Sequence, residues 1–167
     1  ATFSDLTATS LGPIASAKIS FSASGLISDT SVVFSIVAPN PPTISPATGA
    51  TVVSQFTVTY TDNSYWRSVL TSISVNGTSL PDSTYSVSSG QITFYPLKST
   101  LLKTAGSKTI VVSANGFSNT SFTQSISLAV PPAITLATSA TVDASFTNTF
   151  IDDSYWRSQV TSVTIGG

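Results

Sequence analysis

The chain repeats itself with a period of about 90 residues, and this feature constrains its fold more than any other. The segment TDNSYWRSVLTS at 61–72 returns as IDDSYWRSQVTS at 151–162. The segment ISFSASGL at 19–26 likewise corresponds to IVVSANGF at 110–117. Self-similarity at a fixed period is typical of tandem arrays of one structural unit. We therefore expect one complete unit, flanked by the back half of one copy and the front half of another.

Two proline pairs mark the expected boundaries between units. Pro41-Pro42 opens the complete copy, and Pro131-Pro132 opens the next one. Because proline cannot donate a backbone hydrogen bond, a proline pair interrupts a strand and suits a linker. The expected parts are 1–38 as the C-terminal half of a repeat, 41–129 as a complete repeat, and 131–167 as the N-terminal half of a repeat.

Apolar and polar residues alternate within the unit, as over 52–60, which predicts strands with one buried face. Asn76-Gly77 and Asn115-Gly116 suit tight turns between strands, because both residue types tolerate positive φ. The only helical expectation is a single turn at 64–69. The predicted fold class is all-β, with tandem immunoglobulin-like antiparallel β-sandwich repeats of about 90 residues.

The alternation also predicts which side chains fill the core. In the complete unit they are Phe56, Val58, Trp66, Ile73, Val75, Phe94, Ile110 and Val112. In the last segment, Asn148 stands at a position that the alternation reserves for apolar side chains. A polar group placed there must either find a hydrogen-bond partner or face a gap.

Composition removes most of the chemistry used by enzymes. Among 167 residues there is no Cys, His or Met, and only 8% of the residues are charged. Without thiol, imidazole or soft metal ligands, we expect no enzymatic activity, no cofactor and no metal. Asp62 with Asp152 and Asp153 leaves calcium as an alternative, although a site of about six to eight oxygens exceeds this supply.

The sequence also argues against two classes of partner, nucleic acids and membranes. The net charge of −1 provides no basic surface for nucleic acid. No uninterrupted apolar run approaches the roughly 18 residues that a membrane-spanning helix needs. We therefore expect no nucleic-acid partner and no membrane insertion.

The block DNSYWRS, repeated as DDSYWRS, is the longest identity between copies and the first candidate for a site. Trp66 and Trp156 are expected in the structural core, because a Trp side chain buries a large surface and closes one end of a small sandwich. Asp62 or Asp152 is expected to cap the short turn that positions the Trp. The candidate binding residues are Tyr65, Arg67, Tyr155 and Arg157. Aromatic and Arg side chains concentrate binding energy at interfaces.

The order of these signals has a counterpart in a known family. An alternating strand and a Trp after an acidic turn are followed by SISVNGTSL, YSVSSGQITF and KTIVVSANGFSNT. This order resembles the bacterial haemoglobin-interacting domain family, formerly a domain of unknown function. The resemblance covers 41–129 fully and the two flanking parts as halves. It implies an all-β module strung in tandem on secreted and wall-associated bacterial proteins.

Three functions remain open. The leading one is a structural or adhesive segment of an extracellular bacterial surface protein or fibre, whose partners are neighbouring repeats or copies of itself. The second, implied by the resemblance, is a module that captures a host protein, namely haemoglobin. The third is a non-catalytic accessory domain of a secreted enzyme, for which a polysaccharide is a further partner. All three place the chain outside the cell, at its surface.

The two terminal halves are expected to need completion. Half-sandwiches standing alone would expose unpaired strands and an open apolar face, which soluble proteins avoid. Either covalent continuity within a longer array supplies the missing strands, or the C-terminal half of one subunit pairs with the N-terminal half of the next and builds a fibre. The side chains that this pairing would bury are Phe3, Ile19, Phe21, Val142 and Phe146.

Overall fold

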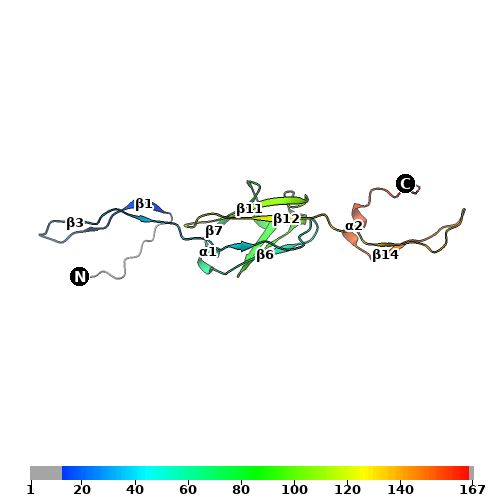
Figure 1. Ribbon diagram of the computed structural model, residues 1–167, viewed down its shortest axis with the longest axis horizontal. Helices are drawn as coiled ribbons and strands as arrows, with labels where there is room; N and C mark the ends of the chain where they lie inside the picture. The colour runs from blue at the N-terminus through cyan, green and yellow to red at the C-terminus, as the bar shows by residue number, and fades with distance from the viewer. Residues whose placement is uncertain (1–12, 166–167) are drawn as a thin grey trace. The chain divides into compact units, whose positions relative to one another are not determined.

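A computed structural model describes residues 13–165 of the chain (Figure 1). Contacts divide the chain into two units, one ending at Leu128 and the other beginning at Ala129. The predicted all-β class is confirmed, because the sheets are antiparallel and the helices are short. Within the described range, no helix is long and apolar enough to span a bilayer.

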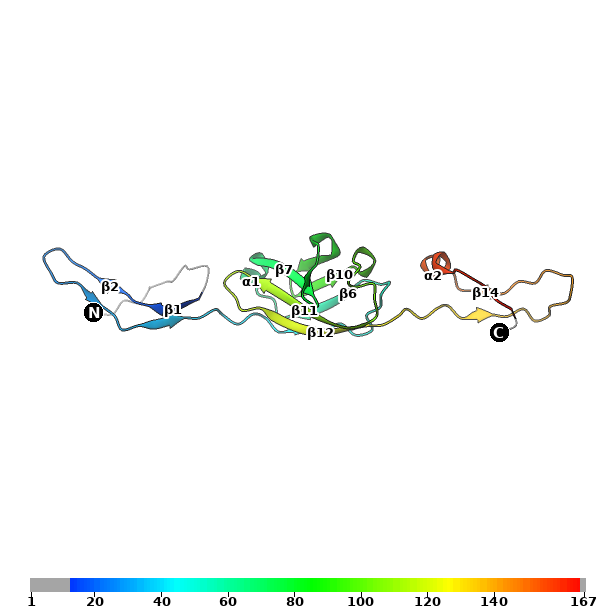
Figure 2. The same cartoon turned by 90° about the horizontal axis from the view of Figure 1, so that it is seen from above.

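Residues 44–127 form what we call the complete domain, which contains two four-stranded sheets. The first sheet has the order β5-β6-β10-β9, with bounds Ile44–Ser45, Phe56–Tyr60, Gln91–Phe94 and Tyr85–Ser88. The second has the order β12-β11-β7-β8, with bounds Thr120–Ile126, Gly106–Ala114, Leu70–Val75 and Thr78–Ser79. Figure 2 shows β11 and β12 running alongside each other. If β5 to β12 are lettered A, B, C, C′, D, E, F and G in chain order, the two orders read A-B-E-D and G-F-C-C′, which resemble the sheets of an immunoglobulin-type domain.

Short helices and a tight turn join these strands. Helix α1 (Ser64–Ser68) connects β6 to β7, at the place where a helical turn was predicted. Asn76 and its following glycine have φ values of 48° and 83°, as the predicted primed turn requires. The 3-10 helices are η1 (Asp82–Thr84) and η2 (Pro96–Lys98).

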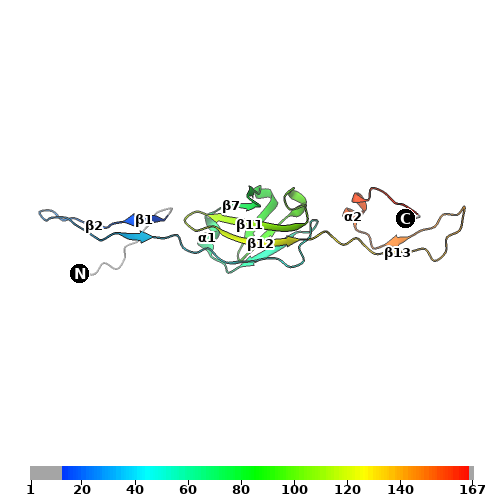
Figure 3. The same ribbon diagram turned by 45° about the horizontal axis from the view of Figure 1, so that its top comes forward.

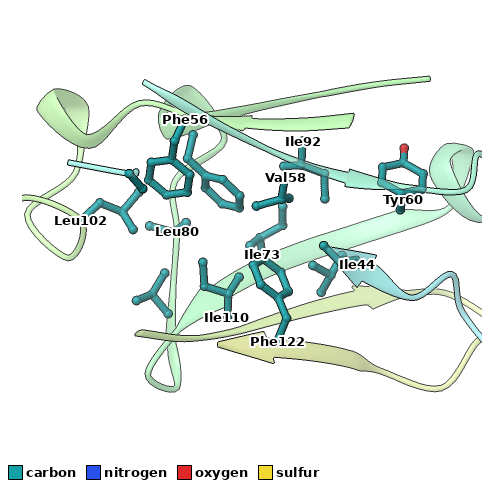
Figure 4. Packing of buried hydrophobic residues seen from close by; sticks show 14 of the residues in the cluster. Ile44, Phe56, Val58, Tyr60, Ile73, Leu80, Ile92, Leu102, Ile110 and Phe122 are labelled. Carbon is teal, nitrogen blue, oxygen red and sulfur yellow. The ribbon is translucent and has the colours of Figure 1, made fainter. Parts of the chain in front are cut away.

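One hydrophobic core receives side chains from both sheets (Figure 4). All eight predicted core residues are at most 5% exposed, which confirms that prediction. The rings of Phe56 and Phe94 stack with centroids 5.2 Å apart, joining neighbouring strands of the first sheet. Gln124 of β12 is also buried, and its amide forms two hydrogen bonds with the backbone of Ala47, of 2.9 and 3.0 Å. A buried amide satisfied in this way avoids the cost of an unpaired polar group.

The residues just before β6 do not extend this strand but pair with the segment that follows β12. The alternation over 52–60 suggested one continuous strand, but β6 begins only at Phe56. Instead, the N–H of Val52 donates to the carbonyl of Ser127 at 3.0 Å, and the N–H of Ser127 donates to the carbonyl of Ala50 at 2.9 Å. Thr51 thereby forms a parallel bridge with Ser127, which is the residue directly after β12. The entry and exit segments of the domain are therefore hydrogen-bonded to each other.

Gly90 lies in the turn between β9 and β10 and lets the backbone of this turn lie close to the backbone of Tyr60. Its φ is +70°, and a Cβ atom there would lie 3.1 Å from the carbonyl oxygen of Tyr60. The carbonyl of Gly90 also accepts a 2.9 Å hydrogen bond from the N–H of Tyr60. Only glycine combines this φ with so little space.

Residues 13–38, which we call the N-terminal segment, form one hairpin whose two arms pair in two short ladders. Strand β1 (Ile14–Ala17) pairs with β4 (Phe34–Ile36), and β2 (Ser20–Phe21) pairs with β3 (Asp29–Thr30). Phe3, one of the residues expected to be buried by a partner, lies outside the described residues.

Residues 129–165, which we call the C-terminal segment, form a hairpin and a helix. Strand β13 (Ile134–Thr135) pairs with β14 (Thr149–Phe150), and helix α2 (Ser154–Gln159) follows. Of the two alternatives expected for Asn148, a partner is found, since its Oδ1 accepts a 2.8 Å hydrogen bond from the N–H of Ala137.

Candidate functional site

The repeated SYWRS block forms α1 in the complete domain and α2 in the C-terminal segment. The prediction that Asp62 or Asp152 caps the helical turn is wrong, because the cap lies one residue later in both copies. The Oδ1 atom of Asn63 accepts a 3.0 Å hydrogen bond from the N–H of Trp66. Asp153 does the same for Trp156 at 2.9 Å. Such a bond satisfies one of the free donors of the first helical turn and fixes where the helix begins.

The two tryptophans differ in burial. Trp66 is fully buried and packs edge-on against Tyr60, with ring centroids 5.1 Å apart. Tyr60 donates its hydroxyl to the carbonyl of Ser88 at 2.8 Å, and burial raises the pKa of this phenol. Trp156, expected in a core, makes the matching contact with Phe150 at 5.0 Å but is only half buried. Among the described residues, the C-terminal segment contains no second sheet to cover it.

Arg67 lies at the surface, where its partly exposed side chain forms an ion pair with Asp62 of the same domain. The same carboxylate accepts hydrogen bonds from Ser89 Oγ at 2.8 Å and from the N–H of Gly90 at 3.2 Å. Arg67 and then Ser89 lower the pKa of Asp62, and Asp62 raises the pKa of Arg67. Arg67, which was predicted to be a binding residue, therefore links α1 through Asp62 to the turn after β9, and its charge is already paired.

Tyr65 is the exposed member of the block. Its side chain is 61% exposed, and its ring lies 5.8 Å from the ring of Phe117. Figures 2 and 3 place α1 at the end of the domain where β11 meets β12, and Phe117 belongs to the turn that joins these strands. We call Tyr65 and Phe117 the aromatic patch.

Sequence reasoning selected Tyr65 but not Phe117. The available signal was an aromatic residue directly after the Asn115-Gly116 turn, since a large apolar side chain is unusual at a turn. The contact with Tyr65 could not be predicted, because Phe117 is far from it along the chain. The two rings meet only because α1 and the turn lie at the same end of the domain.

The C-terminal segment presents a partial copy of this site. Tyr155 is 38% exposed, and Arg157 forms an ion pair with Asp152 at 2.6 Å. Among the described residues, no aromatic ring is paired with Tyr155 as Phe117 is paired with Tyr65.

Two surface hollows of about 230 and 300 Å³ border Lys98. The Nζ atom of Lys98 lies 4.9 Å from the centroid of the Tyr95 ring, so it covers a face that a sugar would need for stacking. The described linings of both hollows lack carboxylates. Among residues 13–165 no group of three or more His, Cys, Asp or Glu side chains could hold a metal ion.

Comparison with known proteins gives one match. The family model described as "Heme-binding protein Shr-like, Hb-interacting domain" matches residues 44–127, which is half of the chain. The matched range runs from the first residue of β5 to the residue after β12 and contains the aromatic patch. No curated protein and no solved structure matches the chain.

Proposed function

We propose, because this chain belongs to the Shr-like Hb-interacting domain family, that its complete domain binds haemoglobin as a protein-capture module. The observation that supports this proposal is the aromatic patch, where Tyr65 is 61% exposed beside Phe117. An exposed tyrosine beside a half-buried phenylalanine at one end of the domain suits the anchoring of a protein partner.

The composition determines the kind of contact we propose. The charged side chains of the repeated block beside the patch, Arg67 and Asp62, already pair with each other. With 8% charged residues, the chain offers little for electrostatic steering. Binding is therefore proposed to depend on apolar burial and on the phenol hydroxyl, with a weak response to salt.

The side chains do not fit direct haem ligation. The chain has no His, Met or Cys, so Tyr is the only remaining common axial ligand. Three of the five tyrosine hydroxyls are hydrogen-bonded within the domain, those of Tyr60, Tyr85 and Tyr95. Tyr65 lies on an exposed helix rather than in a cavity. The proposed ligand is accordingly the globin surface.

The remaining parts of the proposal follow from the same features. We place the module outside a bacterial cell or on its surface, where a host protein is accessible. We also propose that it is non-catalytic, because no nucleophile with a suitable base was found in the sequence.

The test is direct binding of the 167-residue chain to purified vertebrate haemoglobin. Tyr65→Ala and Phe117→Ala are each expected to weaken binding about 30-fold, as for an interface anchor worth about 2 kcal/mol. Tyr155→Ala is the matched control, because it changes the same residue of the repeated block where no aromatic neighbour is present. Haem-free globin is expected to bind as well as the holoprotein.

Two results would reject the proposal. One is the absence of haemoglobin binding by the native chain. The other is binding that survives the Tyr65→Ala and Phe117→Ala double variant, which would move the contact away from the patch. Circular dichroism of each variant shows that a loss of binding does not come from unfolding.

A second candidate is a structural or adhesive segment of a surface protein. It is favoured by one observation, that the SYWRS block forms the same capped helix twice, 90 residues apart. Repeated modules of one design suit length and multivalent attachment. Attachment of chain-coated beads to host cells that lack haemoglobin, unaffected by Tyr65→Ala, would support this candidate over the first.

A further inference from the structure

Two Asn-Gly pairs stand at turns of the complete domain, Asn76-Gly77 and Asn115-Gly116. Such a pair carries an intrinsic chemistry, because the backbone nitrogen of the glycine can attack the side-chain carbonyl carbon, Cγ, of the asparagine. Glycine has no Cβ to hinder this approach, and asparagine is among the thermolabile residues. The structure makes the two pairs unequal in their exposure to this reaction.

At the first pair the side chain is held in place. Asn76 lies between β7 and β8, in a turn closed by the pairing of Val75 with Thr78. Its Oδ1 atom accepts a 2.9 Å hydrogen bond from the N–H of Thr109, and its own N–H donates to the carbonyl of Thr109 at 2.8 Å. Turning the side-chain amide toward the nitrogen of Gly77 breaks the first of these bonds. The folded domain therefore protects this pair.

At the second pair the side chain is not held. Asn115 is exposed, and among the described residues neither its side-chain amide nor the N–H of Gly116 has a hydrogen-bond partner. The ladder between β11 and β12 ends before this turn. One hydrogen bond of 3.2 Å, from the N–H of Phe117 to the carbonyl of Ala114, closes the turn. The attacking nitrogen and the amide that it attacks are thus both unengaged.

We propose that Asn115 is a site of spontaneous deamidation in the folded protein. The nitrogen of Gly116 attacks Cγ of Asn115 and closes a cyclic imide. The bond from Cγ to Nδ2 breaks, and Nδ2 leaves as ammonia with the proton that the Gly116 nitrogen loses. Water then opens the ring. Attack of water at Cγ leaves an aspartyl residue, whereas attack at the main-chain carbonyl carbon leaves an isoaspartyl residue, whose main chain runs through Cβ and Cγ and is longer by one carbon.

The isoaspartyl product changes the turn that positions Phe117. The N–H of Asn115 donates to the carbonyl of Val69, the residue after α1, at 2.9 Å, and the turn then places the Phe117 ring 5.8 Å from the ring of Tyr65. An added main-chain carbon lies inside the loop that the closing hydrogen bond spans, so Phe117 moves away from the helix. Deamidation is then a slow, irreversible switch that disables the aromatic patch, and its effect on haemoglobin binding rests on the proposed function.

The test of the modification is peptide mapping by mass spectrometry, after incubation of the 167-residue chain in mildly alkaline buffer. Electron-transfer fragmentation distinguishes isoaspartyl from aspartyl products. Asn76 is the internal control, because the same dipeptide stands there in the same molecule. In the folded chain Asn115 is expected to react about tenfold faster than Asn76, since a hydrogen bond of ordinary net strength is worth about tenfold. In denaturing urea the two rates should differ little.

Two results would overturn the modification site. One is equal reaction of Asn76 and Asn115 in the folded chain, or faster reaction of Asn76. The other is a difference of the same size in urea, which would place its cause in the local sequence rather than in the fold.

The effect on the patch is measured without haemoglobin, from nuclear Overhauser contacts between the rings of Tyr65 and Phe117. The purified isoaspartyl species is expected to lose these contacts. Asn115→Gln is the matched control, because it keeps an amide but its longer side chain closes an imide far more slowly, so the incubated variant should keep them. Asn115→Asp adds the carboxylate without the extra carbon and should also keep them. Contacts that persist in the isoaspartyl species, or that are lost in Asn115→Asp, would overturn the effect assigned to the added carbon.

Haemoglobin binding is a separate measurement. The isoaspartyl species is expected to bind as weakly as Phe117→Ala, and incubated Asn115→Gln as well as the fresh native chain. A fresh native chain that does not bind haemoglobin would reject the proposed function, while the reaction rates and the ring contacts would still decide the modification and its effect on the patch.

Discussion

The indole ring of Trp66 packs edge-on against the phenol ring of Tyr60, with centroids 5.1 Å apart and ring planes inclined by 68°. Tyr60 ends β6 and Trp66 lies in α1, so the contact attaches the helix to the first sheet. The hydroxyl of Tyr60 extends the attachment to β9 through Ser88. These contacts hold the helix that presents Tyr65 at the surface.

Removing the buried indole should destabilise the complete domain strongly. Trp66→Ala is expected to lower the free energy of unfolding by about 3 to 5 kcal/mol, because it leaves a large cavity in the core. Tyr60→Phe keeps the ring contact and loses the hydroxyl with its hydrogen bond to Ser88, so it should cost about 1 kcal/mol. Urea denaturation followed by circular dichroism measures both values. Similar costs for the two variants would contradict the packing described for Trp66.

Acid should weaken the link between Asp62 and Arg67. The pKa of Asp62 is lowered from its ordinary 3.8 in the folded chain. Its ionised form therefore stabilises the fold above pH 3.8, and this contribution is lost as the pH falls through the lowered value. The expected result is an unfolding midpoint that falls with pH in this range, and less steeply in Asp62→Asn. If the unfolding midpoint of the native chain and that of Asp62→Asn depend on pH in the same way, ionised Asp62 does not stabilise the fold.

Tyr85 should titrate unusually late. Burial, followed by its 2.9 Å hydrogen bond to Asp82, raises the pKa of Tyr85 from 10.0 to about 12. Because the folded state retains this proton, the resulting stability is present below pH 10 and is lost as the pH rises toward 12. Ultraviolet absorbance of phenolate should show a component near pH 12 that disappears in Tyr85→Phe. Its persistence in that variant would assign the late titration to another tyrosine.

The side-chain amide that hydrogen-bonds to Ala47, now supplied by Gln124 of the second sheet, should also be able to come from the first sheet. Gln124→Phe in the complete domain is expected to cost about 1 to 3 kcal/mol, since it leaves the buried amide N–H of Ala47 unpaired. Adding Val58→Asn reproduces the arrangement of Asn148 in the C-terminal segment. The double variant should recover part of the loss, with a favourable coupling of about 0.5 to 3 kcal/mol in a double-mutant cycle. Strictly additive losses would mean that the amide introduced by Val58→Asn does not reach the N–H of Ala47.

Much of the fold was predictable from local pattern. Alternation identified most of the eight core positions, and Asn76 with its glycine identified the tight turn. Strand β10 ends at Phe94, because Pro96 begins η2 shortly after it. The stretch before β6 was misjudged. Its alternation is compatible with a strand, but its hydrogen bonds go to Ser127, and no local pattern reveals a partner so distant along the chain.

The site was predictable only in part. Repetition of the SYWRS block located Tyr65 and the buried Trp66. It could not show that Arg67 is paired with Asp62, because both residues are polar and close in sequence whether or not they touch. Nor could it show Phe117, whose place beside Tyr65 depends on the tertiary fold.

The pairing of Ser127 with Ala50 and Val52 has a mechanical consequence. Thr51 and Ser127 run parallel, close to where the chain enters and leaves the complete domain. A tensile force applied through the two flanking linkers first loads β5, and then pulls the backbone segments at Thr51 and Ser127 along their own axes in opposite directions. The hydrogen bonds between them are then loaded in shear and must break together, rather than one after another as in an unzipping hairpin. A domain built this way resists extension where shear or flow pulls on the protein, before its core is exposed.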